Sequence, residues 1–162
     1  MFFKLLITVC VFTVSVRAVW VHVGKGCIEA KDNSFKEFTY SGPSLTVRKV
    51  LFYHREGRIS CQAFYDSYWG CKPTDPKIGI LIVTSRSQIP RYSKFDQRGF
   101  YLLPGYTSMS DSLQFRAPGD FDSFHITHGE KIRVWYGEDY YRPDLEYDNR
   151  GKTCFDMHMY LK

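Results

Sequence analysis

The sequence HGEKIRVWYGEDYYRPDLEYDNRGKTCFDMHMYLK, at residues 128–162, is the most informative part of the chain. Within it, residues 131–136 and 153–161 alternate apolar and polar side chains with a period of two, as strands with one buried face do. We predict that these two strands pair with each other and close an all-β domain. The acidic segment between them would then form a loop at one end of that domain.

Further short segments bounded by turn residues predict strands at residues 19–23, 34–40, 44–54, 58–65, 77–84, 99–103, 112–115 and 121–127. The turn at residues 55–57 predicts a hairpin between two of them, and a change of phase at Arg48 and Lys49 predicts a bulge. The apolar run KIGILIVT at 77–84 is typical of a central strand covered on both faces. No segment has a helical period, so we predict a disulfide-stabilised antiparallel β-sandwich of jelly-roll-like form.

The first 18 residues, MFFKLLITVCVFTVSVRA, have the features of a secretory signal peptide. Lys4 precedes an apolar run of about 12 residues, whereas a membrane-spanning helix needs roughly 20. We therefore predict a signal peptide at residues 1–18, a single mature domain at residues 19–162 with no membrane span, and an extracellular location.

Four cysteines remain after such a leader, and an even number in a secreted chain favours two disulfides. Cys61 and Cys71 flank a short loop, and Cys27 and Cys154 lie near the two ends of the mature chain. The simplest pairing is therefore Cys61 with Cys71 and Cys27 with Cys154. No cysteine spacing is typical of a zinc site.

Charge and composition argue against a nucleic-acid partner. The formal net charge is +5, and the basic residues are spread along the chain without a run. Aromatic residues make up 17% of the chain, and part of that content is compatible with a binding face.

The acidic loop is a candidate calcium site, because closely spaced carboxylates can supply several of the six to eight oxygen ligands of calcium. The candidate ligands are Glu138, Asp139, Asp144, Glu146, Asp148 and Asn149. The loop is not an EF-hand, since its sixth position is Asn149 and its twelfth is Phe155. The alternative is a solvated loop whose acids pair with Arg142 and Arg150. The sequence indicates no cofactor other than calcium.

Two groups of aromatic residues are candidate ligand contacts. The loop between Cys61 and Cys71 holds Tyr65, Tyr68 and Trp69 beside polar residues, which suits either sugar stacking or a protein contact. The alternative is that Trp69 packs beneath the loop. The second group is Tyr140 and Tyr141, at the start of the acidic loop.

The segment from Trp135 to Leu161 resembles the closing hairpin of small secreted modules of marine invertebrates, including extracellular-matrix and mucin-like proteins of corals. The matched elements are Trp135 with Tyr136, Glu138 with Asp139, the acidic run at 146–149, Gly151 and Cys154. FYHREGRISC at 52–61 and YWGC at 68–71 are similar in kind. The resemblance implies a non-enzymatic part of a secreted matrix or surface protein.

We therefore predict a secreted, non-catalytic protein that binds extracellular-matrix proteins or glycans, with calcium as a candidate ligand. A lectin-like glycan-binding protein is one alternative. A secreted hydrolase is the other, although the chain has no G-x-S-x-G motif and no residue that we identify as catalytic.

Overall fold

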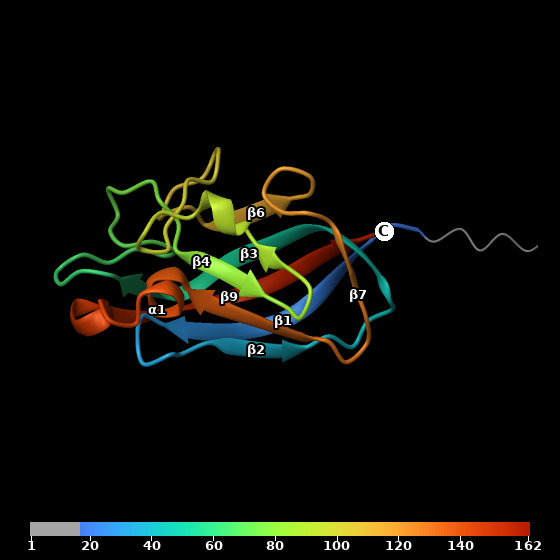
Figure 1. The fold of residues 1–162 in the computed structure, drawn as a ribbon, viewed down its shortest axis with the longest axis horizontal. Coiled ribbons are helices and arrows are strands. Elements are labelled where there is room, and N and C mark those ends of the chain that lie inside the picture. The colour runs from blue at the N-terminus through green and yellow to red at the C-terminus, as the bar shows by residue number, and fades with distance from the viewer. Residues whose placement is uncertain (1–16) are drawn as a thin grey trace, which may run out of the picture.

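The computed structural model describes residues 17–162, which fold into two stacked antiparallel sheets (Figure 1). The predicted β-sandwich is therefore confirmed. The signal peptide predicted at residues 1–18 lies mostly outside the described residues.

The larger sheet has the order β1-β9-β3-β6, with β7 also pairing with β3. Its strands are β1 (Val19–Glu29), β9 (Arg150–Leu161), β3 (Leu45–Ser60), β6 (Ser112–Arg116) and β7 (Phe124–Ile126). The smaller sheet has the order β2-β8-β4-β5. Its strands are β2 (Lys36–Thr39), β8 (Lys131–Tyr136), β4 (Ile80–Val83) and β5 (Gln88–Ile89).

The inner faces of the two sheets enclose an apolar, aromatic-rich core. Phe52 on β3 and Phe155 on β9 pack edge to face, with ring centroids 5.1 Å apart. Ile132 and Val134 contribute from β8, and both are completely buried. The period-two alternation in the sequence arises because one face of each strand meets this core while the other faces outward.

The predicted pairing of residues 131–136 with 153–161 is wrong, because the two strands belong to different sheets. β8 pairs with β2 and β4, whereas β9 pairs with β1 and β3. Alternation reports that one face of a strand is buried, and a strand in either layer of a sandwich meets that condition. The acidic segment crosses from one sheet to the other at the end of the sandwich opposite the C-terminus (Figure 1). It contains the short helices α1 (Gly137–Tyr141) and η2 (Glu146–Asp148).

The predicted hairpin at residues 44–65 is also wrong, since β3 runs without a turn from Leu45 to Ser60. The register shifts between His54 and Glu56, and Gly57 has a φ of 78°. A Cβ atom on Gly57 would lie 2.2 Å from the Lys152 carbonyl oxygen, so the glycine permits a bulge and a close approach to β9. The bulge predicted at Arg48 and Lys49 is confirmed by a register shift between Val47 and Lys49.

Other predicted strands are confirmed with different lengths. Residues 77–84 contain β4, which lies between β8 and β5, and its Ile80, Leu81 and Ile82 are completely buried. β1 extends to Glu29, beyond the predicted end at residue 23.

The strand predicted at residues 99–103 is not formed, and this segment contributes only the bridge between Tyr101 and Ile78. The short helix η1 (Tyr92–Lys94) follows β5.

Both disulfides have the predicted pairing. Cys27 and Cys154 are directly opposite each other on β1 and β9, and their bond joins residues 127 positions apart. Cys61 and Cys71 close the aromatic loop after β3. Within residues 17–162, no helix is both long enough and apolar enough to cross a membrane.

Candidate functional site

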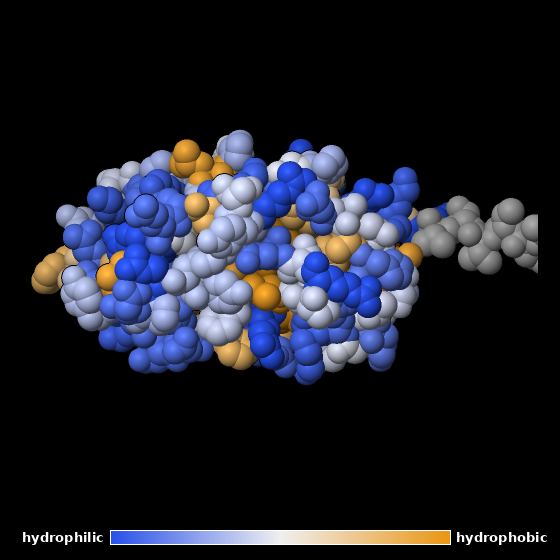
Figure 2. Space-filling view, in the orientation of Figure 1, coloured by the Kyte–Doolittle hydropathy of each residue, from blue (hydrophilic) through white to orange (hydrophobic). Residues whose placement is uncertain are grey.

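The outer face of the smaller sheet carries a continuous set of polar and aromatic side chains. Strand pairing aligns Glu37, Arg133, Val83 and Gln88 in one row across the sheet. Trp135 follows two residues after Arg133 on β8 and therefore points to the same face. This face is towards the viewer in Figure 2, where it is mainly hydrophilic with apolar surface exposed in a hollow near its middle.

Five aromatic rings form a chain of contacts at the α1 end of this face, and we call them the aromatic row. Its members, in order of contact, are Phe35, Trp135, Tyr140, Tyr141 and Tyr92. Neighbouring ring centroids are 4.4 to 5.7 Å apart. Phe35 is 39% exposed, Tyr140 is 37% exposed and Tyr92 is 72% exposed. The row thus combines ring surface with access to solvent, as a platform for an amphipathic ligand requires.

Polar groups lie beside the aromatic row. The Arg133 guanidinium lies 5.1 Å from the centroid of the Phe35 ring. Gln88 donates a hydrogen bond to the Tyr141 hydroxyl. The buried Trp135 Nε1 has no hydrogen-bond acceptor among the described residues, which makes it a candidate donor to a bound molecule or water.

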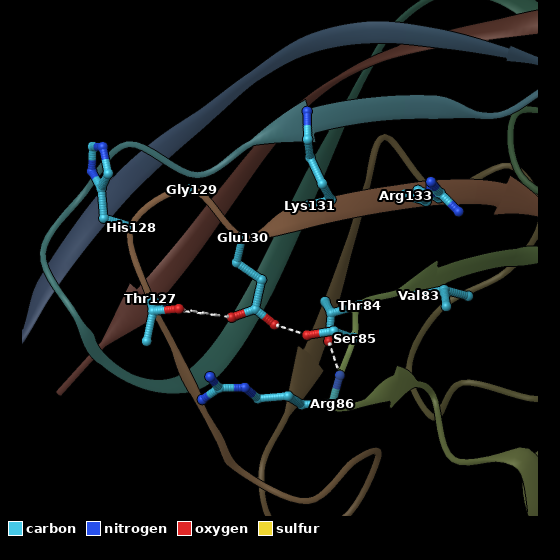
Figure 3. Close-up of a pocket in the computed structure, with 10 residues that line it drawn as sticks. All are labelled: Val83, Thr84, Ser85, Arg86, Thr127, His128, Gly129, Glu130, Lys131 and Arg133. Carbon is cyan, nitrogen blue, oxygen red and sulfur yellow. Dashed lines mark hydrogen bonds between the residues drawn. The ribbon is translucent and has the colours of Figure 1, made fainter.

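A hollow of about 540 Å³ opens at the other end of β8, between the β4–β5 turn and the β7–β8 turn (Figure 3). Glu130 lies at its centre and is 9% exposed. One carboxylate oxygen of Glu130 accepts a hydrogen bond from Ser85 Oγ at 2.9 Å, and the other accepts one from the Thr127 backbone N–H at 3.2 Å. Arg86, Lys131 and Arg133 also line the hollow. Carboxylate, hydroxyl and cationic groups in one concave surface suit a ligand with many hydroxyl groups.

Two of these cations share one carboxylate on the neighbouring strand. Lys131 Nζ lies 3.0 Å from Glu37 Oε1, and Arg133 Nε donates to Glu37 Oε2 at 2.9 Å. The bond from Arg133 and the bond from Lys131 lower the pKa of Glu37 below its usual value. This three-residue contact fixes the polar edge of the face next to the hollow.

The acidic segment places three polar side chains in the interior at the end of the sandwich. Glu138 is completely buried, and Asp139 and Asn149 are nearly so. Arg98 Nε donates to Glu138 Oε1 at 2.6 Å, and the Asn33 backbone N–H donates to Asp139 Oδ1 at 3.0 Å. Glu138 Oε2, Asp139 Oδ2 and Asn149 Oδ1 have no hydrogen-bond partner within the described part of the chain. We call Glu138, Asp139 and Asn149 the acidic cluster.

The titration behaviour of this cluster reflects its burial. Burial raises the pKa of Asp139 to about 7, and the neighbouring Glu146 carboxyl adds to the increase. Burial also raises the pKa of Glu138, although Arg98 opposes the shift. Buried carboxylates with unpartnered oxygens are expensive unless a cation or a proton compensates them.

Four of the six predicted calcium ligands separate into two groups, and the other two, Glu146 and Asp148, lie on η2. Glu138, Asp139 and Asn149 contribute buried, unpartnered oxygens, which fit the preference of calcium for oxygen ligands. Asp144, by contrast, is exposed and paired with Arg142, as the alternative interpretation of the loop predicted. Over residues 17–162 no group of three His, Cys, Asp or Glu side chains already stands in metal-binding geometry. A calcium ion at the cluster would thus need a shift of the side chains around it.

The loop between Cys61 and Cys71 buries its tryptophan, as the alternative interpretation predicted. Trp69 is completely buried, and its Nε1 donates to the Ser110 carbonyl oxygen at 2.5 Å, so its assignment as a ligand contact is wrong. Tyr68 stacks on His54 with ring centroids 3.8 Å apart, under the Arg58 guanidinium. Tyr65 is exposed but belongs to no aromatic row. A lone sequence pattern cannot separate a buried tryptophan from an exposed one, because both occur beside polar loop residues.

Sequence reasoning identified Tyr140 and Tyr141 but missed Phe35, Trp135, Tyr92 and Arg133. All six residues together come from four separate segments, and only the pairing of β2 with β8 and the position of η1 bring them together. The outward position of Trp135 in the alternation of residues 131–136 was the one available signal.

Comparison with known proteins shows that the chain is similar in structure to a lectin. No protein-family model matches the chain, and no curated protein matches it. A search of solved structures matches the chain to one structure with a TM-score of 0.73. That structure is AJLec, a lectin from the sea anemone Anthopleura japonica, which is 29% identical. The match covers 89% of this chain and 98% of AJLec.

The expected resemblance to secreted proteins of marine invertebrates is thus supported at that general level. The match is to a lectin, and no family match supports a coral matrix or mucin-like module in particular.

Proposed function

We propose that this protein is a non-catalytic, extracellular glycan-binding protein that binds sugar on the outer face of its smaller sheet. The observation that carries the proposal is the aromatic row and the hollow at opposite ends of β8 on one face, on a fold shared with a sea anemone lectin. The comparison favours this role over the matrix-protein role that the sequence suggested first.

The chemistry of the face supports a sugar ligand. A pyranose ring has an apolar face that packs on aromatic rings and hydroxyl groups that need several hydrogen-bond partners. Tyr140 and Phe35 offer exposed ring surface, and Arg133 and Glu130 offer charged hydrogen-bonding groups within the same face. Arg133 contacts Phe35 and also lines the hollow, so it links the two parts of the site.

We also propose that the acidic cluster binds a calcium ion that orders the α1 end of this face. Asp139 belongs to the cluster, and the next residue along α1 is Tyr140 of the aromatic row. A cation that fixes Asp139 would therefore fix the backbone that presents Tyr140. The unpartnered oxygens of Glu138, Asp139 and Asn149 support this assignment.

A glycan array probed with the secreted protein tests the proposal. Selective retention of a defined set of glycans is expected, and Tyr140→Ala should weaken it about tenfold, the equivalent of one aromatic contact worth about 1.4 kcal/mol. Tyr53→Ala is the matched control, since Tyr53 has a similar exposure but lies on the larger sheet. Absence of any retained glycan, or equal binding by Tyr140→Ala, would overturn the proposal.

Repeating the array in calcium and in EGTA tests the role of the cation. Reduced binding in EGTA, with full recovery on adding calcium, is expected. Equal binding in both buffers would remove calcium from the proposal and leave glycan binding standing.

A further inference from the structure

Two histidines face each other on the outer side of the larger sheet, away from the proposed glycan-binding face. His22 on β1 is directly opposite His158 on β9, and their ring centroids are 4.8 Å apart. Asp156 lies two residues before His158 on β9, so its side chain is on the same side of the sheet. The His22 Nε2 and Asp156 Oδ1 atoms are 3.2 Å apart.

This arrangement brings three ligand-type side chains to one point. Residues i and i+2 of a strand share a face, and a residue directly opposite on the neighbouring strand has its Cβ atom about 5 Å away. His22, Asp156 and His158 occupy those three positions. Two imidazoles and one carboxylate are among the ligands that zinc takes, and three protein ligands leave the fourth tetrahedral position open to solvent.

We propose that His22, Asp156 and His158 form a surface site for a zinc-type divalent cation. The ligand is Zn²⁺ or a d-block ion of similar preference, because imidazole nitrogen suits these ions better than it suits calcium. The site is independent of the acidic cluster, which offers oxygen atoms alone.

The present side-chain positions show what binding would require. Asp156 is nearly buried and also accepts a bond from Arg55 Nε on its other oxygen, Oδ2, at 2.6 Å. Oδ1, the oxygen next to His22, is therefore the one available to a metal. His158 must turn towards this oxygen, because across residues 17–162 no group of three such side chains is already in coordinating geometry.

The charges around the site set its strength. Arg55 and Lys25 place positive charge beside Asp156 and oppose a cation. We therefore expect micromolar affinity, which is weaker than that of a structural zinc site.

Titration of the mature, untagged protein with Zn²⁺ in saturating calcium tests this inference. One equivalent is expected to bind, and His22→Gln or His158→Gln should each weaken binding at least tenfold. Co²⁺ in place of Zn²⁺ should give the visible absorption of a nitrogen-ligated tetrahedral site. His125→Gln is the matched control, because His125 is exposed on β7 and remote from β1.

A second variant keeps the test decisive if a histidine variant folds poorly. Arg55→Gln removes a competing charge and leaves all three ligands in place, so it should tighten Zn²⁺ binding several-fold. Unchanged Zn²⁺ affinity in folded His22→Gln and His158→Gln, or no Zn²⁺ binding by the parent protein, would overturn the proposal. Neither outcome bears on glycan binding, which is measured on the opposite face.

Discussion

Arg98 Nε donates a hydrogen bond of 2.6 Å to Oε1 of Glu138, a carboxylate that is completely buried at the end of the sandwich. The guanidinium reaches in from the segment before residues 99–103 and also lies 3.4 Å from the Cys61 carbonyl oxygen. The Arg98 side chain therefore joins the loop between Cys61 and Cys71 to the acidic segment, which is far from that loop in the sequence.

Arg98→Met should destabilise the protein by about 3 kcal/mol, because it leaves a buried carboxylate without its charged partner. Urea unfolding at neutral pH measures the change. Arg142→Met is the matched control, since Arg142 pairs with the exposed Asp144 and its loss should change the free energy of unfolding far less. Equal effects of the two variants would show that the buried ion pair is not the cause.

The free energy of unfolding should decrease from pH 5 to pH 8 in calcium-free buffer, because Asp139 loses its proton in this range. Its pKa in the folded protein is about 7, above the value of 3.8 expected when unfolded. The folded state thus holds a proton that the unfolded state has lost, so stability decreases as pH rises through this window and levels off above it. Asp139→Asn should remove this decrease, as the amide oxygen can still accept the Asn33 N–H bond.

Asp144→Asn is the control for that measurement. The bond from Arg142 lowers the pKa of Asp144 below the usual range of an aspartate, so the loss of this carboxyl should leave the pH 5 to 8 profile unchanged. A wild-type profile parallel to that of Asp139→Asn would contradict the assignment.

If calcium occupies the acidic cluster as proposed, it should raise the melting temperature more at pH 8 than at pH 5. At the lower pH a proton on Asp139 competes with the ion. Differential scanning fluorimetry with millimolar calcium measures the shift. An equal shift in melting temperature at both pH values would mean that calcium binds away from Asp139. No shift in the wild-type protein would exclude calcium binding.

The two disulfides should contribute unequally to stability. In the chain-entropy model, the Cys27–Cys154 bond, with a sequence separation of 127, contributes about 5 kcal/mol, and the Cys61–Cys71 bond, with a separation of 10, contributes about 3 kcal/mol. Paired serine variants of each bond, unfolded in urea, measure the difference. The order of the two effects is the prediction, and its reversal would mean that local packing outweighs loop entropy.

Substitution of Trp69 should reduce mainly the stability of the protein, and substitution of Tyr140 should reduce mainly its glycan binding. Trp69→Ala removes a completely buried ring and the donor to Ser110, so it should cost about 3 to 5 kcal/mol. Tyr140→Ala should change the free energy of unfolding by less than about 1 kcal/mol while weakening glycan binding, because Tyr140 is partly exposed. Melting and array measurements on the same samples compare the two.

The alternation of residues 131–136 and 153–161 was sufficient to predict two strands that each have one buried face. It was insufficient to predict their partners. The segment at residues 137–149 is long enough either to form a hairpin loop or to cross between layers, and the sequence carries no signal that separates the two. The same ambiguity produced the incorrect hairpin at Gly57, whose positive φ serves a bulge as well as a turn.

The strand pattern by itself determined the class of fold, because it reflects the burial of alternate side chains, and the cysteine positions predicted as the simplest pairing the one that the structure has. Only the tertiary structure decided which aromatic rings are exposed and which polar groups meet. Phe35, Trp135, Tyr140 and Tyr92 become neighbours through strand register and loop placement. Those contacts join distant segments, and their energies depend on burial and distance in space, which local sequence does not encode.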